Sequence, residues 1–293
     1  MSTSTATSAA TNERAVLRQL TWIQAKRYAS HPLFLVPLLL LAFTAIALSD
    51  DAPSSYYTLG DHVTSAFLLG VFGIVVAYRL TRTEDRALAL LPSAPTTATT
   101  RTLALLGACL VPAAAGLVML AVRLITWAVW PPPEDLVPTA GGWLPVLAMQ
   151  IDGFVVASFG APALGVAAGR WLRFPGAGVL VALTVTLATV VFVSGAQQVP
   201  GAGDSAIVRA LAAAMPWADW MVINQPDGQP AELLGIRPGA PIGHLLYAVS
   251  LSGLACWAAV MKDAVGATRQ RWTRIGAALG LAAAITYLWA LLG

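Results

Sequence analysis

The sequence has few charged residues. Asp, Glu, Lys and Arg together make up 11% of its 293 residues, whereas 57% are hydrophobic, and the mean hydropathy is +0.72. A soluble domain must hydrate its surface and does not reach such values. The composition therefore excludes an ordinary soluble protein and predicts a chain that crosses a membrane several times.

Lysine and cysteine are also scarce. Of the 17 basic residues only 2 are Lys, and the Arg residues lie in short clusters between apolar runs, which is how membrane topology is encoded. The net charge of +3 therefore does not indicate nucleic acid, and we expect no nucleic-acid partner. Cys109 and Cys256 each lie inside an apolar run, where they are interpreted as small buried hydrophobic residues.

Nucleotide-binding and catalytic motifs are missing from the sequence. It contains no P-loop, no Rossmann glycine fingerprint and no Gly-x-Ser-x-Gly nucleophile elbow. His31, His62 and His244 are scattered at predicted membrane edges without neighbours at ligand spacing, which argues against a metal site. The spans leave no room for a nucleotide-hydrolysing domain of about 150 residues. We expect no enzyme activity and no cofactor in this chain, so that any energy must come from a partner.

Apolar stretches with at most one charged residue mark seven candidate spans, judged against the roughly 20 residues that cross a hydrocarbon core. They cover residues 33–48, 62–80, 102–126, 143–169, 176–195, 242–261 and 275–292. The predicted fold class is all-α, a polytopic transmembrane helix bundle of six or seven spans embedded in the lipid bilayer. This transmembrane domain is expected to occupy residues 29–293.

Positive charges predict the orientation of the bundle. With the N-terminus inside, 14 of the 17 Lys and Arg residues face the cytoplasm, and only Arg123, Arg209 and Arg237 lie on or near the outer side. The expected location is the cell membrane, with a cytoplasmic N-terminus and, if the seventh span is real, an external C-terminus. Residues 45–47 also fit a signal-peptide cleavage site, although the preceding polar region of about thirty residues is long for that role.

Two segments precede the first span. Residues 1–11 are almost wholly Ser, Thr and Ala, a composition that predicts a disordered tail. Residues 12–28 predict a helix with Val16, Leu20 and Ile23 on one face, which suits an amphipathic helix at the inner membrane surface. The alternative is a solvated extension of the first span.

The loop after the second span has the most informative pattern. Charged residues from Arg79 to Arg86 precede a short apolar helical piece, and a turn bounded by Pro92 and Pro95 leads to Arg101. Together with the stretch Ala-Lys-Arg-Tyr-Ala-Ser-His-Pro-Leu-Phe at 25–34, this loop resembles the permease subunits of type-2 ABC exporters, especially the version common in high-GC actinobacteria. In that family the N-terminal amphipathic helix lies at the inner membrane surface, and this loop holds the coupling helix that docks on the ATPase.

The resemblance implies a function and partners. This chain would be the permease subunit of an ABC exporter, paired with a second permease copy or paralogue and with ABC ATPase subunits that bind the ATP. It would move a substrate outward, and the sequence does not identify that substrate. The positions that match the coupling loop are Glu84, Asp85, Arg86, Leu88, Leu90, Leu91 and Pro92.

Other interpretations stay open. The loop charges could serve only to fix orientation. The usual family layout has six spans with both ends inside, and the seventh span departs from it. A non-transporting membrane sensor or assembly factor is the main alternative function, and a membrane enzyme comes third.

Two ionisable residues and two glycine pairs lie inside predicted spans. Asp152 would lie about 14 Å below the outer interface and Arg123 about 10 Å below it, at 1.5 Å of rise per residue. Charges at this depth are tolerated when they pair or face a wet cavity, so we expect an Arg123–Asp152 pair, either structural or on a substrate pathway. The small-xxx-small pairs predict close helix packing, within one bundle or between subunits. They are Gly165 with Gly169 and Gly276 with Gly280.

Overall fold

The computed structural model describes residues 3–47, 61–90, 96–132, 136–139, 141–194, 205–216, 220–223, 232–235 and 241–292. Its elements are α1 (Thr3–Ala29), α2 (Pro32–Ala47), α3 (Asp61–Ser65), η1 (Ala66–Val71), α4 (Phe72–Leu90), α5 (Ala98–Ala108), α6 (Leu110–Val129), α7 (Leu136–Thr139), α8 (Trp143–Ile151), η2 (Asp152–Val156), α9 (Ala157–Trp171), α10 (Ala177–Thr189), η3 (Val190–Ser194), α12 (Ala206–Ala213), β1 (Trp220–Ile223), β2 (Glu232–Gly235), α13 (Pro241–Met261) and α14 (Gly266–Leu292). The elements η1 to η3 are π-helical turns. Apart from the short antiparallel pair β1 and β2, the secondary structure described is helical, which confirms the all-α prediction.

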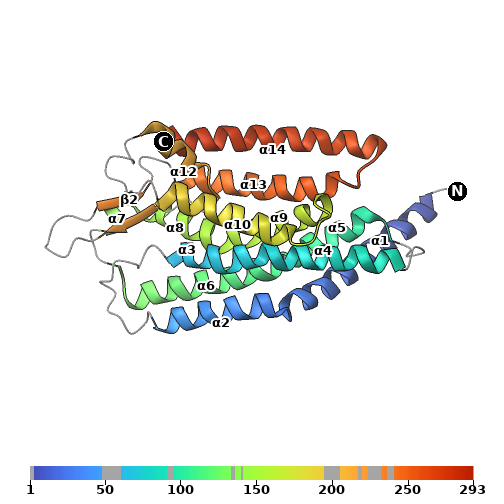
Figure 1. Cartoon of the computed structure of the whole chain (residues 1–293), viewed down its shortest axis with the longest axis horizontal. Helices are drawn as coiled ribbons and strands as arrows, with labels where there is room; N and C mark the ends of the chain where they lie inside the picture. Colours follow the sequence, from blue (N-terminus) through green and yellow to red (C-terminus); the bar gives the residue numbers. More distant parts are fainter. Residues whose placement is uncertain are drawn as a thin grey trace.

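The long helices lie side by side along the longest axis of the molecule (Figure 1). Five are long and apolar enough to cross a membrane, and they indicate a membrane-embedded protein. A sixth span results if the helices 13–29 and 32–44, which meet at a bend of 62°, are counted as one. The five are His62–Ala87, Ala98–Val129, Trp143–Trp171, Pro241–Met261 and Gly266–Leu292.

The predicted count of seven spans is not confirmed. The span expected at 33–48 corresponds to α2, which has 16 residues, and the one expected at 176–195 corresponds to the apolar helix Ala177–Phe192. Both are shorter than the roughly 20 residues that a hydrocarbon core requires. Uncharged runs locate the apolar helices, but they do not show where a helix ends, because the chain can leave a helix without a charged residue.

The N-terminal helix differs from its prediction. It begins at Thr3, so that residues 3–11, expected to be disordered, are helical. It packs against α5, where Gly107 lies against the side chain of Thr21. Ile23, on the predicted apolar face, is exposed, whereas Tyr28 is buried. An interfacial helix would also expose its apolar face to lipid, so the amphipathic interfacial helix stays a prediction.

The centre of the bundle is the contact between α4 and α9. Gly165 lies directly against the backbone of Ile74, and a Cβ added at Gly169 would lie 2.7 Å from the Cβ of Thr81. The first predicted glycine pair thus serves close packing within the bundle, which is one of the two uses that the sequence left open.

The last helix lies at the edge of the bundle and packs mainly against α13. Gly276 of the second glycine pair lies against the indole of Trp257, whereas Gly280 faces open space. Leu281 and Ile285 of α14 are 63% and 58% exposed. Much of the apolar surface of this helix is therefore not covered by the described part of the chain.

The helices α4, α9 and α13 end at the same end of the molecule, the right-hand end in Figure 1. We call it the basic end, because many Arg and Lys residues lie in or next to these helix ends and the neighbouring starts of α5 and α14, among them Arg79, Arg82, Arg86, Arg101, Arg170, Arg173, Lys262, Arg269 and Arg271. The elements α3, α7 and the two strands lie at the opposite end (Figure 1). The helices thus bring together basic clusters that the sequence assigned to one side.

Candidate functional site

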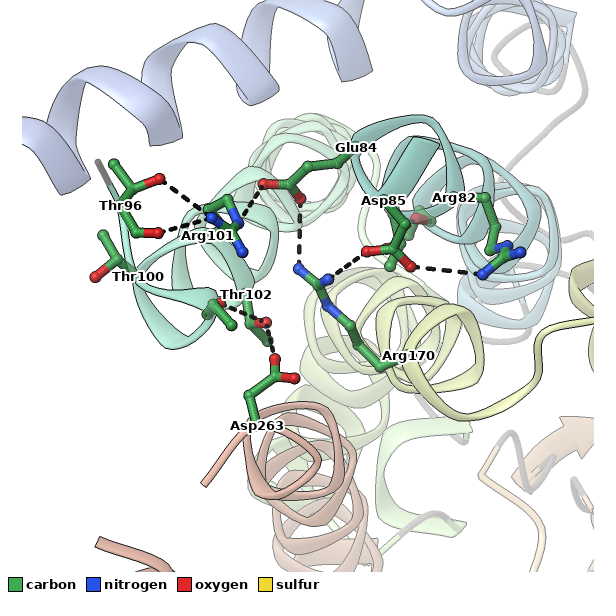
Figure 2. Close-up of polar contacts among 12 residues, drawn as sticks. Arg82, Glu84, Asp85, Thr96, Thr100, Arg101, Thr102, Arg170 and Asp263 are labelled. Atoms are coloured by element: carbon green, nitrogen blue, oxygen red, sulfur yellow. Dashed lines mark hydrogen bonds and ion pairs between the residues drawn. The ribbon is translucent and has the colours of Figure 1, made fainter. Parts of the chain in front are cut away.

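An ion-pair cluster joins three helices at the basic end (Figure 2). Arg170, at the end of α9, extends Nη1 to within 2.6 Å of Asp85 Oδ1 and Nη2 to within 3.4 Å of Glu84 Oε2. Both carboxylates belong to α4. Glu84 Oε1 also lies 3.8 Å from Nε of Arg101 on α5, and Asp85 Oδ2 lies 3.5 Å from Nη1 of Arg82, one turn earlier on α4. The cluster therefore fixes the end of α4 to α5 and α9.

The central side chains of this cluster are buried, which distinguishes it from ion pairs on the surface. The side chain of Arg170 is 6% exposed and that of Glu84 is 12% exposed. A charge at such a position loses most of its hydration, so it is stable only while its partners stay in place. A second link lies beside it, because the hydroxyl of Thr102 on α5 donates to Asp263 Oδ2, after α13, at 3.2 Å (Figure 2).

The predicted coupling residues fall in and beyond this cluster. Glu84 and Asp85 turn toward α5 and α9 and are held by arginines of the same chain, whereas Arg86 is exposed. Leu88 and Leu90 belong to the last turn of α4. Leu91 and Pro92 lie outside the described residues. Within the predicted coupling segment, Glu84 and Asp85 are thus paired inside the chain, whereas Arg86 is available on the surface.

A second polar cluster is buried away from the basic end. Asp152 begins the π-helical turn η2, and its Oδ2 lies 2.7 Å from Nδ1 of His244 on α13. The Nε2 atom of His244 lies 3.1 Å from the backbone oxygen of Met215, which follows α12. His244 is 1% exposed and Asp152 is 7% exposed. Nearby in sequence, Gln150 Nε2 lies 3.4 Å from Nδ1 of His62, so that four buried polar residues line this region.

Hydrogen-bond chemistry determines how protons are arranged in the Asp152–His244 pair. A carbonyl oxygen only accepts, so Nε2–H of His244 must donate to Met215. One proton is then shared between Nδ1 and Oδ2, either as imidazolium with carboxylate or as neutral imidazole with carboxylic acid. This arrangement can take up or hold one proton inside the bundle. π-Helical turns such as η2 often occur at functional sites.

The structure gives Asp152 a partner that the sequence analysis did not foresee. Arg123, its predicted partner, is half-buried on α6, and the Arg123–Asp152 pair stays a prediction. His244 is separated from Asp152 by 92 residues, and the only sequence signal for it was an isolated histidine near an apolar run. Among the residues that the structure describes, no three His, Cys, Asp or Glu side chains are grouped so that they could hold a metal ion.

An apolar cavity of about 470 Å³ lies beside the central helices. Its walls include Gly160 and Leu164 of α9, Val185 of α10, and Leu251 and Trp257 of α13. None of its described lining residues is charged, so this cavity suits an apolar group.

Comparison with known proteins does not identify the chain. No protein-family model, curated protein or solved structure matches it. The functional assignment therefore depends on the sequence pattern and on the geometry of these sites.

Proposed function

We propose that this chain is the transmembrane permease subunit of an ABC exporter. The observation that carries the proposal is the charged end of α4, which continues to Leu90 and is fixed to α9 by Arg170 and to α5 by Arg101. A partner that pushes on the segment 84–92 would move three helices together. A helix end that served only to fix orientation would not need buried partners on two other helices.

The proposal includes the partners and the orientation. ATP would bind to a separate ABC ATPase subunit, because this chain has no nucleotide-binding motif and no expected enzyme activity or cofactor of its own. A second permease copy or paralogue would complete the transporter in the cell membrane. The basic end would face the cytoplasm together with the N-terminus, as the positive-inside rule requires.

The apolar cavity offers a place for the transported molecule. It borders α9 and α13, and α9 is the helix that Arg170 ties to the proposed coupling segment. Movement of α9 would change the shape of the cavity. The proposed substrate therefore has an apolar part, and the transport direction is outward, as in the family that the sequence resembles.

Purification of the tagged chain in a mild detergent tests this proposal. We expect an ATP-hydrolysing protein to copurify with the chain, and the chain alone to show no ATPase activity. In the variant Leu91→Asp a charge enters the proposed docking surface, and recovery of the ATPase should fall by about tenfold or more at unchanged membrane levels.

A matched control separates docking from general effects of charge. Val265, in the turn between α13 and α14, is 78% exposed, and Val265→Asp should leave ATPase recovery unchanged. Equal recovery with Leu91→Asp and wild type would show that the loop is only a connector. If no ATPase is recovered at all, the chain is better explained as a non-transporting sensor or assembly factor.

A further inference from the structure

A basic pocket lies at the same end of the bundle as the ion-pair cluster and shares only Arg82 with it among its described lining residues. Its volume is about 490 Å³, and it lies between the start of α2, the end of α4 and the turn that joins α9 to α10. We call it the arginine pocket. The lining residues that matter here are His31, Arg79, Arg82, Arg86, Arg173 and Gly176.

The pocket concentrates positive charge. Four arginines line it, and none of its described lining residues is Asp or Glu. Arg82 is paired with Asp85, whereas Arg79, Arg86 and Arg173 are exposed and form no ion pair within the described part of the chain. Burial and the positive charge of Arg79 lower the pKa of His31. An anion inside the pocket would relieve this repulsion between like charges.

Two hydrogen bonds hold the pocket in shape. The hydroxyl of Tyr78 on α4 donates to the backbone oxygen of Phe174 at 2.7 Å, and Nη2 of Arg82 donates to the backbone oxygen of Arg173 at 3.3 Å. They fix the α9–α10 turn against α4. Gly176, with φ of +84°, then allows the chain to enter α10, and the positive end of this helix dipole lies at the pocket wall.

Apolar surface begins directly beside the pocket. α2 and α10 both pack against α4, and both present exposed apolar side chains within two turns of His31 and Gly176. On α2, Val36 is 54% exposed, and on α10, Leu180 is 54% exposed. A free soluble anion would gain nothing from this surface, whereas the acyl chains of a lipid would cover it.

We propose that the arginine pocket binds the phosphate group of an anionic phospholipid, with the acyl chains lying on the apolar surface of α2 and α10. Basic pockets between transmembrane helices recognise such head groups, because guanidinium groups form charge-assisted hydrogen bonds with phosphate oxygens. The inference does not rest on the proposed exporter function. Arg86 belongs both to the pocket and to the proposed coupling segment, so the test below uses Arg79 and Arg173.

Lipid retention by the purified chain tests the inference. Native mass spectrometry would compare added dioleoylphosphatidylglycerol with dioleoylphosphatidylcholine, for the wild type and for the double variant Arg79→Gln/Arg173→Gln. Neither side chain belongs to the ion-pair cluster, and Arg173 accepts from Arg82 through its backbone, so the fold should persist. We expect one phosphatidylglycerol to be retained preferentially by the wild type, and about tenfold weaker binding in the variant.

Controls separate this pocket from general attraction by positive charge. Arg269→Gln/Arg271→Gln removes the same charge from exposed positions of α14 at the same end and should bind lipid as the wild type does. Equal retention by the wild type and by Arg79→Gln/Arg173→Gln would overturn the site. Displacement of the lipid by an equal concentration of inorganic phosphate would assign the pocket to a soluble anion and overturn the lipid assignment.

Discussion

The two polar clusters of this bundle balance their charges in different ways. At the basic end, Glu84 and Asp85 share three arginines, and each carboxylate lies near two of them. In the buried cluster, the carboxyl group of Asp152 shares a proton with His244, and both residues are almost fully buried.

The two clusters differ in how much charge compensation remains after one residue is removed. A cluster with several partners near the end of the bundle keeps part of its charge compensation, and water can reach it. The Asp152–His244 pair lies in the interior, where an uncompensated group costs several kcal/mol. The first arrangement suits a contact that transmits movement between helices, and the second suits a fixed contact that holds η2 and α13 together.

The largest effect is expected from breaking the buried pair. His244→Leu leaves the carboxyl group of Asp152 without its hydrogen-bonding partner, and we expect a loss of about 3 kcal/mol in the free energy of unfolding. Denaturant unfolding of the purified chain in detergent measures this. Asp152→Asn should cost less than half as much, because an amide can still donate to Nδ1 of a neutral ring. A loss with His244→Leu no greater than with Asp152→Asn would contradict this account.

An intermediate effect is expected from Arg170, the centre of the other cluster. Arg170→Gln leaves Asp85 with Arg82 and Glu84 with Arg101, so we expect a loss of about 2 kcal/mol in the same unfolding assay. Arg271→Gln on the exposed start of α14 serves as a control and should stay within about 0.5 kcal/mol of the wild type. If Arg170→Gln lowers the free energy of unfolding by more than His244→Leu does, the remaining ion pairs of the cluster do not compensate for the loss, and the difference drawn between the two clusters is wrong.

The smallest effect is expected at the link between α5 and the end of α13. Thr102→Val removes the hydroxyl that donates to Asp263 but keeps the shape of the side chain. Because Asp263 is partly exposed and can bind water instead, we expect a loss of about 0.5–1 kcal/mol. Thr273→Val, at an exposed position of α14, is the matched control in the same unfolding assay. A loss as large as that of Arg170→Gln would show that Thr102 belongs to the main cluster.

The sequence predicted much of the helix arrangement, because apolar stretches and the charges between them can be recognised from neighbouring residues alone. The stretches 102–126 and 143–169 were recognised because each is apolar with a single charged residue, Arg123 or Asp152, and both lie inside helices long enough to cross a membrane. The grouping of Arg101 and Arg170 at one end followed from alternating sides in successive spans. Their pairing with Glu84 did not follow, because it depends on how α4, α5 and α9 are rotated against one another.

The buried cluster shows the limit of such reasoning. Asp152 could be singled out because a carboxylate inside an apolar run is unusual. Its contact with His244 could not, since consecutive spans were the natural place to look for a partner and the structure instead brings α13 beside α8. A change of direction between α1 and α2 was implied by an interfacial helix at 12–28 before a span at 33–48, but the angle of 62° could not be read from the residues around His31.

The edge position of α14 has a consequence for biosynthesis. The chain is made from its N-terminus, so the helices that form the α4–α9 centre emerge before α14 does. Since α14 packs mainly against α13 and is joined to it by a short turn with Gly266 at φ of +57°, the two can form a hairpin late in synthesis. The core of the bundle can then close before the last helix arrives, and α14 would enter the membrane using a surface supplied almost entirely by its immediate predecessor.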